Sequence, residues 1–131
     1  MREIALDTQA ATAVAIIEDG RVIGRAHNDS GRHHAESITP LVREALGDAG
    51  LPSTLADAGI DRVLVGTGPA PFTGLRSGLV SARVLARVAS VPAYGVSALD
   101  VIARQGLDLL APDTRVYAIA DARRRELYWG A

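Results

Sequence analysis

The most informative part of this chain reads Val63-Leu-Val-Gly-Thr-Gly-Pro-Ala-Pro-Phe-Thr-Gly-Leu-Arg-Ser-Gly-Leu-Val-Ser-Ala-Arg-Val-Leu-Ala-Arg87. It begins with a short apolar run, which is typical of a strand buried on both faces. The glycines and prolines between Gly66 and Gly74 predict a tight loop. After Gly74, apolar residues recur every three or four positions, and this spacing predicts a helix over Leu75–Arg87 with a broad apolar face. The stretch therefore predicts a strand, a loop and a helix in succession.

Three predicted strands precede this unit. They cover Arg2–Leu6, Ala13–Ile17 and Val22–His27. Asp19-Gly20 lies between the second and the third, and this dipeptide between two apolar runs is a strong hairpin signal. An amphipathic helix is predicted over His34–Ala49, and Gly50 ends it.

The part of the chain after the predicted helix is less regular. Val91–Val96 is predicted as a strand and Ala98–Gly106 as a short helix, with Ser97 as its N-cap. A linker over Asp108–Asp113 and two strands, Arg115–Ala120 and Glu126–Trp129, follow. A lone hairpin is marginally stable in water, so this one packs on the first part or belongs to a second lobe. We expect one domain over residues 1–110 and the start of an incomplete second lobe over residues 111–131.

Early meandering strands followed by alternating helices and strands favour an α/β fold. The expected arrangement is a mixed five-stranded sheet flanked by helices. With an Asp directly after the first strand, this layout is similar to the ribonuclease-H-like lobe of the actin and sugar-kinase superfamily. A likeness of fold assigns no function by itself.

The composition excludes several classes of protein. Acidic and basic residues nearly cancel, with a formal net charge of −1, so no overall field draws the chain to nucleic acid. The absence of cysteine removes disulfides, thiolate metal sites and a cysteine nucleophile. Every basic residue is arginine, and without lysine neither a Walker-type phosphate loop nor Schiff-base chemistry is available. No apolar run reaches the ~20 residues that span a bilayer and no secretory leader is visible, so we expect a cytoplasmic protein.

Three stretches together resemble one bacterial family. They are Leu6-Asp7-Thr8 with the strand after it, Gly68-Pro-Ala-Pro-Phe-Thr-Gly-Leu-Arg76 continuing to Gly95-Val-Ser-Ala-Leu99, and Asp121-Ala-Arg-Arg-Arg-Glu-Leu-Tyr-Trp129. In this order and spacing they are similar to the TsaB (YeaZ-like) family, the dimerisation subunits of the bacterial tRNA threonylcarbamoyladenosine system. That family was formerly regarded as glycoprotease-like relatives of the M22 peptidases.

The chain departs from the family pattern in two ways. Ala70 and Pro71 stand where the family loop usually has Gly-Ser, and a proline removes one amide donor from a loop that could cradle an anion. Family members also usually continue through most of a second lobe, so we expect a truncated version here.

The resemblance implies a two-lobed actin-like fold without catalysis of its own. Such subunits pair with a related catalytic subunit, TsaD, and an ATPase subunit, TsaE, binds the pair. The assembly places a threonylcarbamoyl group on an adenosine next to the anticodon of tRNA. We therefore expect TsaD-like and TsaE-like partners, a homodimer when the chain is alone, and contact with tRNA only through the complex. No cofactor, metal or membrane association is expected.

The family dimer is built from the two helices of the first lobe. The interface residues expected here are Ile38, Leu41, Val42, Leu75, Leu79, Val80, Ala82, Arg83 and Val84. Independently of the family, the apolar stripe of the second helix is wider than packing on one sheet needs, because Val80, Val84 and Val88 continue it. Arginines at positions 76, 83 and 87 edge this flank, as in a rimmed protein interface. Packing of the helix in its own core explains the rest of the stripe.

Four residues are candidates for the remnant of an anion or nucleotide site. Asp7 and Thr8 lie where kinases of the superfamily hold a metal-nucleotide phosphate, and Thr73 and Gly74 are near the start of a helix whose free amides could bind an anion. The simpler interpretation is that Asp7 caps a turn and the loop positions the helix.

Two polar clusters have simple explanations. His33, His34 and Glu36 lack the spacing of a metal-binding helix, because adjacent residues point about 100° apart. Arg123-Arg124-Arg125 is either a solvated hairpin turn or a contact with tRNA phosphate or an acidic partner surface. No catalytic residue is assigned.

Two functions follow from these observations. The favoured one is a non-catalytic dimerisation subunit of a tRNA-modifying complex. The alternative is an actin-fold enzyme, either a small-molecule kinase or an M22 glycoprotease-like metallopeptidase. The lack of a recognisable Ser-His-Asp order, of a metal quartet and of lysine favours the first.

Overall fold

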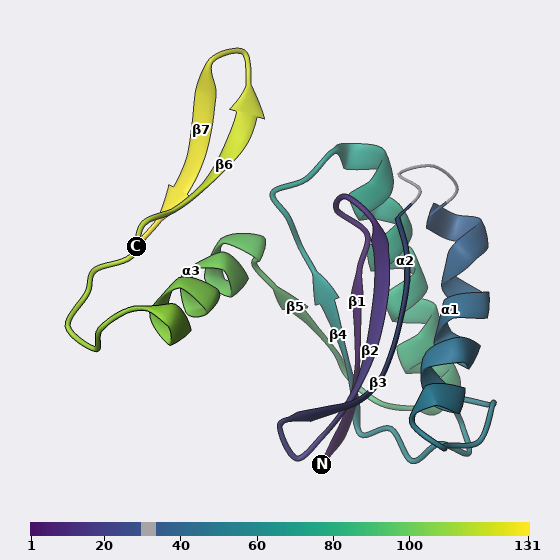
Figure 1. Ribbon diagram of the computed structural model, residues 1–131. Coiled ribbons are helices and arrows are strands. Elements are labelled where there is room, and N and C mark those ends of the chain that lie inside the picture. The colour runs from purple at the N-terminus through teal and green to yellow at the C-terminus, as the bar shows by residue number, and fades with distance from the viewer. Residues whose placement is uncertain (30–33) are drawn as a thin grey trace.

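A mixed five-stranded sheet forms the centre of the computed structural model, which describes residues 1–29 and 34–131 (Figure 1). The strands are β1 (Arg2–Asp7), β2 (Thr12–Glu18), β3 (Arg21–Asn28), β4 (Arg62–Gly66) and β5 (Ala93–Val96). Their order across the sheet is β3-β2-β1-β4-β5. β1, β2 and β3 are antiparallel, whereas β4 and β5 run parallel to β1. The predicted mixed sheet is confirmed.

The turn between β2 and β3 has the backbone that its sequence predicts. Asp19 and Gly20 both have positive φ angles, 49° and 80°, as a type I′ hairpin turn requires. Beside this turn, the Arg2 guanidinium donates to Glu18 Oε1 at 2.5 Å and to the carbonyl oxygen of Ala58 at 2.6 Å. The N-terminal ammonium donates to Asp19 Oδ1 at 2.6 Å, and this bond raises the pKa of the ammonium and lowers the pKa of Asp19.

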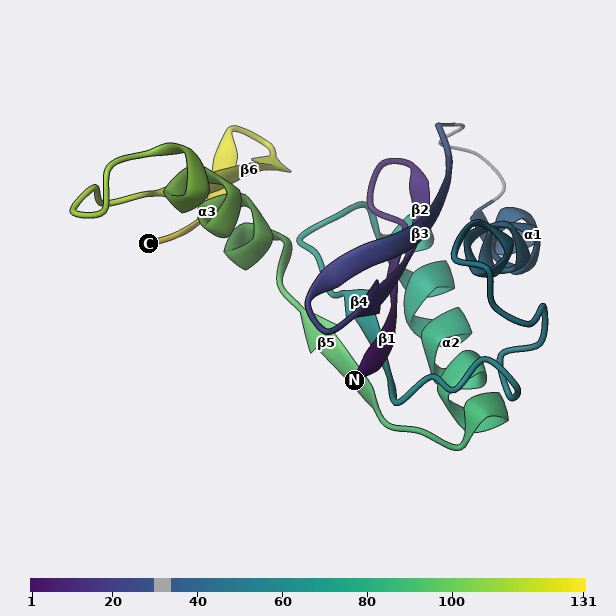
Figure 2. The ribbon, with the colours of Figure 1, turned by 60° about the horizontal axis from the view of Figure 1, so that its bottom comes forward.

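Two helices cover the same face of the sheet (Figure 2). α1 (His34–Asp48) packs on β2 and β3, and α2 (Phe72–Ala89) packs mainly on β4. As predicted, Gly50 ends α1: its φ is 70°, and the next amide, of Leu51, donates to the carbonyl of Leu46 at 2.9 Å. The core lies between the helices and the sheet, and its fully buried side chains include Ile4, Ile16, Leu46 and Val63.

α2 begins at Phe72, earlier than the predicted Leu75, so the prediction of a loop up to Gly74 was wrong at this end. Pro71 is the N-cap residue. Glycines and prolines had been assigned to the loop as breakers, but proline also suits the start of a helix, where no intrahelical partner exists for its missing amide.

Small residues let α2 lie close to the sheet. Its buried residues are Gly74, Gly78, Ala82 and Ala86. A β-carbon at position 78 would overlap the hydroxyl oxygen of Thr8, which follows β1. That hydroxyl donates to the carbonyl oxygen of Gly74 at 2.5 Å, and Thr8 is only 2% exposed. Close packing against Thr8 therefore explains why a glycine occupies position 78 inside the helix.

The residues after β5 form a smaller unit beside the sheet (Figure 1). α3 (Ala98–Leu109) contacts the antiparallel pair β6 (Ala118–Arg123) and β7 (Glu126–Gly130). The predicted bounds were wrong here, because α3 continues into the predicted linker and β6 begins and ends later than expected. Ser97 occupies the N-cap of α3, but its side chain makes no capping hydrogen bond. That residues 111–131 begin a second lobe stays a prediction.

The face of the sheet opposite α1 and α2 is hollowed. Several of the residues that alternate with the core positions on β1, β2 and β4 are small, and Ala5, Ala13, Ala15 and Leu64 are partly buried. They line a hollow of about 500 Å³, together with residues from β3 and the start of α3. Its charged and polar rim consists of Asp7, Gln9, Arg25 and His27.

Gly78→Ala is expected to lower the free energy of unfolding by about 1–3 kcal/mol, because the added methyl group overpacks against Thr8. Gly47→Ala in α1 is the matched control. An added β-carbon there has nothing within 4 Å, so this change should stabilise by up to about 1 kcal/mol. Denaturant unfolding measures both, and Thr8→Ala combined with Gly78→Ala should recover part of the loss. Strictly additive effects would contradict the close contact.

Candidate functional site

An apolar ridge runs along the outer side of α2. Val80, Val84 and Val88 recur at four-residue spacing and are 54%, 55% and 58% exposed. Because the glycines and alanines of α2 face the sheet, these valines lie on the opposite side of the helix. We refer to the three residues as the valine ridge. A contiguous exposed apolar row differs from single scattered exposed residues, which need no explanation.

Arginines flank this ridge on one side. Arg76, Arg83 and Arg87 are exposed, and at about 100° per residue they fall within a ~40° sector of the helix. We call them the arginine row. Phe72, at the start of α2, is 74% exposed. The sequence pattern predicts a loop at Phe72, whereas the proline before it is the signal that a helix starts there.

The residues predicted for the interface divide into two groups in the structure. Four are buried in the core of this chain: Ile38, Leu41, Val42 and Ala82, with 3%, 6%, 5% and 0% exposure. Leu75 and Leu79 are partly buried. Val80, Arg83 and Val84 are exposed on α2. A contact with a second chain thus depends on the exposed group, because the buried residues already pack inside this chain.

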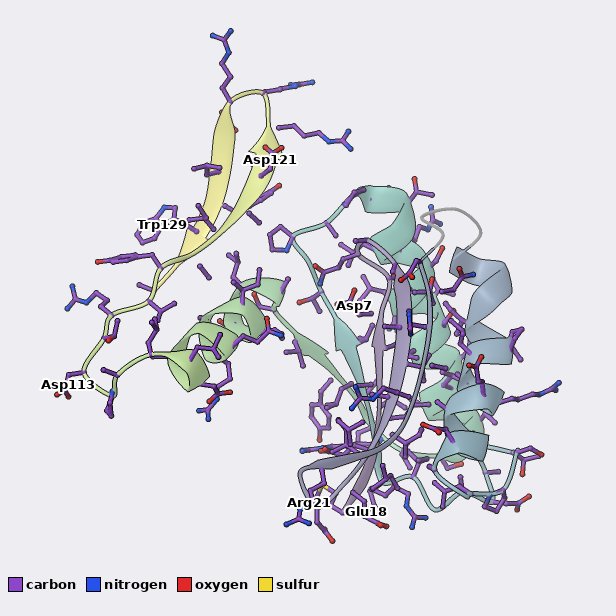
Figure 3. The ribbon with its side chains drawn as sticks, viewed as in Figure 1. Asp7, Glu18, Arg21, Asp113, Asp121 and Trp129 are labelled. Carbon is purple, nitrogen blue, oxygen red and sulfur yellow. The ribbon has the colours of Figure 1, made fainter. Side chains whose placement is uncertain are left out.

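The structure brings together two of the four residues predicted as an anion-site remnant. Thr8 and Gly74 share the buried hydrogen bond described above. The carboxylate of Asp7, at the end of the sheet in Figure 3, accepts a bond from the amide of Gln9 at 2.8 Å, the turn that the simpler interpretation expects. Thr73 is exposed in the first turn of α2. The hydroxyl of Thr8 therefore joins the end of β1 to α2, and the carboxylate of Asp7 holds the turn after β1.

The arginine cluster lies at the tip of the β6–β7 hairpin. All three residues have positive φ: 63° for Arg123, 52° for Arg124 and 64° for Arg125. Arg123 also lines a hollow of about 450 Å³ between the hairpin and the loop before α2, opposite Pro69 and Phe72. Figure 3 shows Asp121 and Trp129 on this hairpin, apart from Asp7 on the sheet.

Two observations concern metal and membrane. His33 lies outside the described residues, and so do the side chains of His34 and Glu36. Across the residues that are described, no group of three metal-ligating side chains comes together. Within the same part of the chain, no helix is both long and apolar enough to cross a bilayer.

Thr8→Val is expected to lower the free energy of unfolding by about 0.5–1.5 kcal/mol, because it removes the buried hydrogen bond to the carbonyl of Gly74. Ser77→Ala is the control: Ser77 Oγ donates to a carbonyl of the same helix at 3.3 Å in an exposed position, so little change is expected. Magnesium-ATP should leave the melting temperature of both variants and of the unaltered chain unchanged. A magnesium-ATP shift that Thr8→Val removes would assign Thr8 to a ligand instead.

Comparisons with known proteins agree with this architecture. The family model for TsaD, tRNA N6-adenosine threonylcarbamoyltransferase, matches residues 24–131. The tRNA threonylcarbamoyladenosine biosynthesis protein TsaB of Escherichia coli is 40% identical across 98% of this chain and 54% of its own length. An uncharacterized protein of Mycobacterium tuberculosis is 44% identical across 96% of this chain and 56% of its own length. The chain spans about half the length of the curated relatives it matches.

Solved structures show the same likeness. YeaZ from Pseudomonas aeruginosa is 35% identical with a TM-score of 0.80, covering 98% of this chain and 58% of its own. A ROK hexokinase from Thermus thermophilus shares the fold alone, with a TM-score of 0.54 at 17% identity over 85% of this chain and 38% of its own. The predicted sugar-kinase-like fold is confirmed. This chain therefore belongs to the TsaD family of glycoprotease-like proteins, as a TsaB/YeaZ-like member.

Proposed function

We propose that this chain is a non-catalytic dimerisation subunit in tRNA threonylcarbamoyladenosine biosynthesis. It pairs with a TsaD-like catalytic subunit through α2. A TsaE-like ATPase and tRNA engage only the assembled complex. When no partner is present, the chain forms a homodimer through the same surface.

The valine ridge is the observation that carries this proposal. Its three residues are half-exposed or more, whereas the small residues of α2 that face the sheet are buried in the core. Covering the exposed half of one valine is worth about 1 kcal/mol. Binding of a second chain to the ridge releases this free energy. Such binding also explains why the apolar stripe of α2 is unusually wide. The likeness to TsaB supports a role in tRNA threonylcarbamoyladenosine biosynthesis.

The junction between β1 and α2 supports the non-catalytic part of the proposal. The position at which superfamily kinases hold phosphate is occupied here by a structural hydrogen bond from Thr8 to Gly74 and by the Asp7 turn. The Thr8 hydroxyl serves the packing of α2, which carries the ridge, and the Asp7 carboxylate serves the turn after β1. A role in assembly requires only these structural contacts and no ligand at this position.

Val84→Glu is expected to weaken association with the TsaD-like subunit of the same genome by tenfold or more, because a charge in the centre of an apolar contact loses its hydration. The fold should be retained, since Val84 is 55% exposed. Association is measured by co-purification and titration, and tRNA modification by an in vitro assay with and without this chain.

Val101→Glu is the matched control for this experiment. Val101 is a 46% exposed helical valine on α3, away from the ridge. It should leave association with the TsaD-like subunit unchanged. Equal loss in both variants, or unfolding of Val84→Glu, would contradict an interface at the ridge. Undiminished modification activity without this chain would contradict the proposed role.

A further inference from the structure

The charges beside the valine ridge have one sign. α2 carries Arg76, Arg83 and Arg87 and no acidic residue. None of the three arginines is ion-paired with any residue that the structure describes. An interface between identical copies uses the same patch twice, so it needs a patch that complements itself. A surface with charges of a single sign lacks this property.

The position of the arginine row on α2 determines where its charges lie when two identical copies pair. All three arginines lie on one flank of the ridge, within the ~40° sector described above. In a two-fold pair with antiparallel α2 helices, symmetry places the same flank of both helices on the same side of the seam. The two arginine rows then run side by side, and juxtaposed like charges oppose binding. With parallel helices, each row faces the opposite flank, where Ser77 and Ser81 offer no carboxylate.

Among the α1 side chains that the structure describes, too few are acidic to balance these charges. Among the α1 side chains that the structure describes, the exposed charged residues are Arg43, Glu44 and Asp48. Asp48 Oδ2 already accepts a hydrogen bond from the amide of Arg25 at 3.0 Å. Arg43 offsets Glu44 within the same turn. Asp48 keeps its charge, but against the three arginines of α2 it leaves a net positive charge beside the apolar ridge among the residues that the structure describes.

We infer that α2 fits a chain different from itself, whose packing helix carries apolar residues beside a row of Asp or Glu. This inference rests on the proposed function, because it concerns the partner of the same surface. It adds the charge of that partner and the physical reason for choosing it over a second copy. Charge complementarity of this kind contributes to specificity and to the rate of encounter more than to final affinity.

The salt dependence of binding distinguishes pairing with a TsaD-like subunit from pairing with a second copy of this chain. Raising NaCl from about 0.05 M to about 0.5 M shortens the screening length from more than 10 Å to a few ångströms. Binding of the TsaD-like subunit should weaken over this range, because attraction between the arginine row and its acids is screened. Self-association of this chain, measured by sedimentation, should strengthen, because repulsion between two arginine rows is screened.

Charge reversal at one arginine tests the same point without salt. Arg83→Glu should weaken binding of the TsaD-like subunit about five- to tenfold, mainly through slower association. It should strengthen self-association, because the new carboxylate can pair with the arginine row of the second copy. Arg83→Lys should preserve both behaviours. Arg115→Glu, an exposed arginine after α3 with the same change in net charge, is the matched control and should alter neither.

Two results overturn the inference. One is equal affinity of Arg83→Glu and the unaltered chain for the TsaD-like subunit, and the other is self-association that falls as salt rises. Comparison with Val84→Glu shows whether the inference about charge or the proposed function itself has failed. If Val84→Glu abolishes partner binding and Arg83→Glu leaves it intact, the interface stands and only the charge selection is wrong. If neither variant affects binding, the interface itself is wrong.

Discussion

The close contact between Thr8 and the first turns of α2 is the constraint on which the rest of the structure depends. A buried hydroxyl bonds to the carbonyl of Gly74, and Gly78 leaves no side chain between helix and sheet. Helix and strand backbones can approach this closely only where side chains are absent or small. The contact fixes both the height of α2 above the sheet and its rotation about its own axis.

That rotation decides which residues meet solvent. With glycines and alanines turned to the sheet, the larger valines lie on the outer side of α2 and the arginines on one flank. In the same arrangement, the polar groups of Thr8 and Asp7 at the end of β1 form structural hydrogen bonds. Core packing and the candidate interface are therefore two sides of one helix, and a change in the first displaces the second.

The local signals in the sequence predicted the fold well, because each depends on a few neighbouring residues. Asp19-Gly20 and Gly50 predicted a hairpin and a helix end from the φ angles they adopt readily, and both are present. The start of α2 was missed because Pro71 suits a loop and a helix N-terminus equally well. Periodicity also could not separate Leu41 in the core from Val84 on the surface, since it shows that an apolar face exists and not what covers it. That distinction depends on tertiary packing.

The β6–β7 hairpin carries the only tryptophan of the chain, Trp129, which is 68% exposed with its ring centroid 6.5 Å from that of Tyr117. Indole emission thus reports on the hairpin and does not report on the five-stranded sheet. The aromatic residue that β5 contributes to the sheet is a tyrosine, Tyr94. Indole fluorescence follows the hairpin, whereas far-UV circular dichroism follows the secondary structure of the whole chain. Coincident melting curves from the two would show that hairpin and sheet unfold as one cooperative unit.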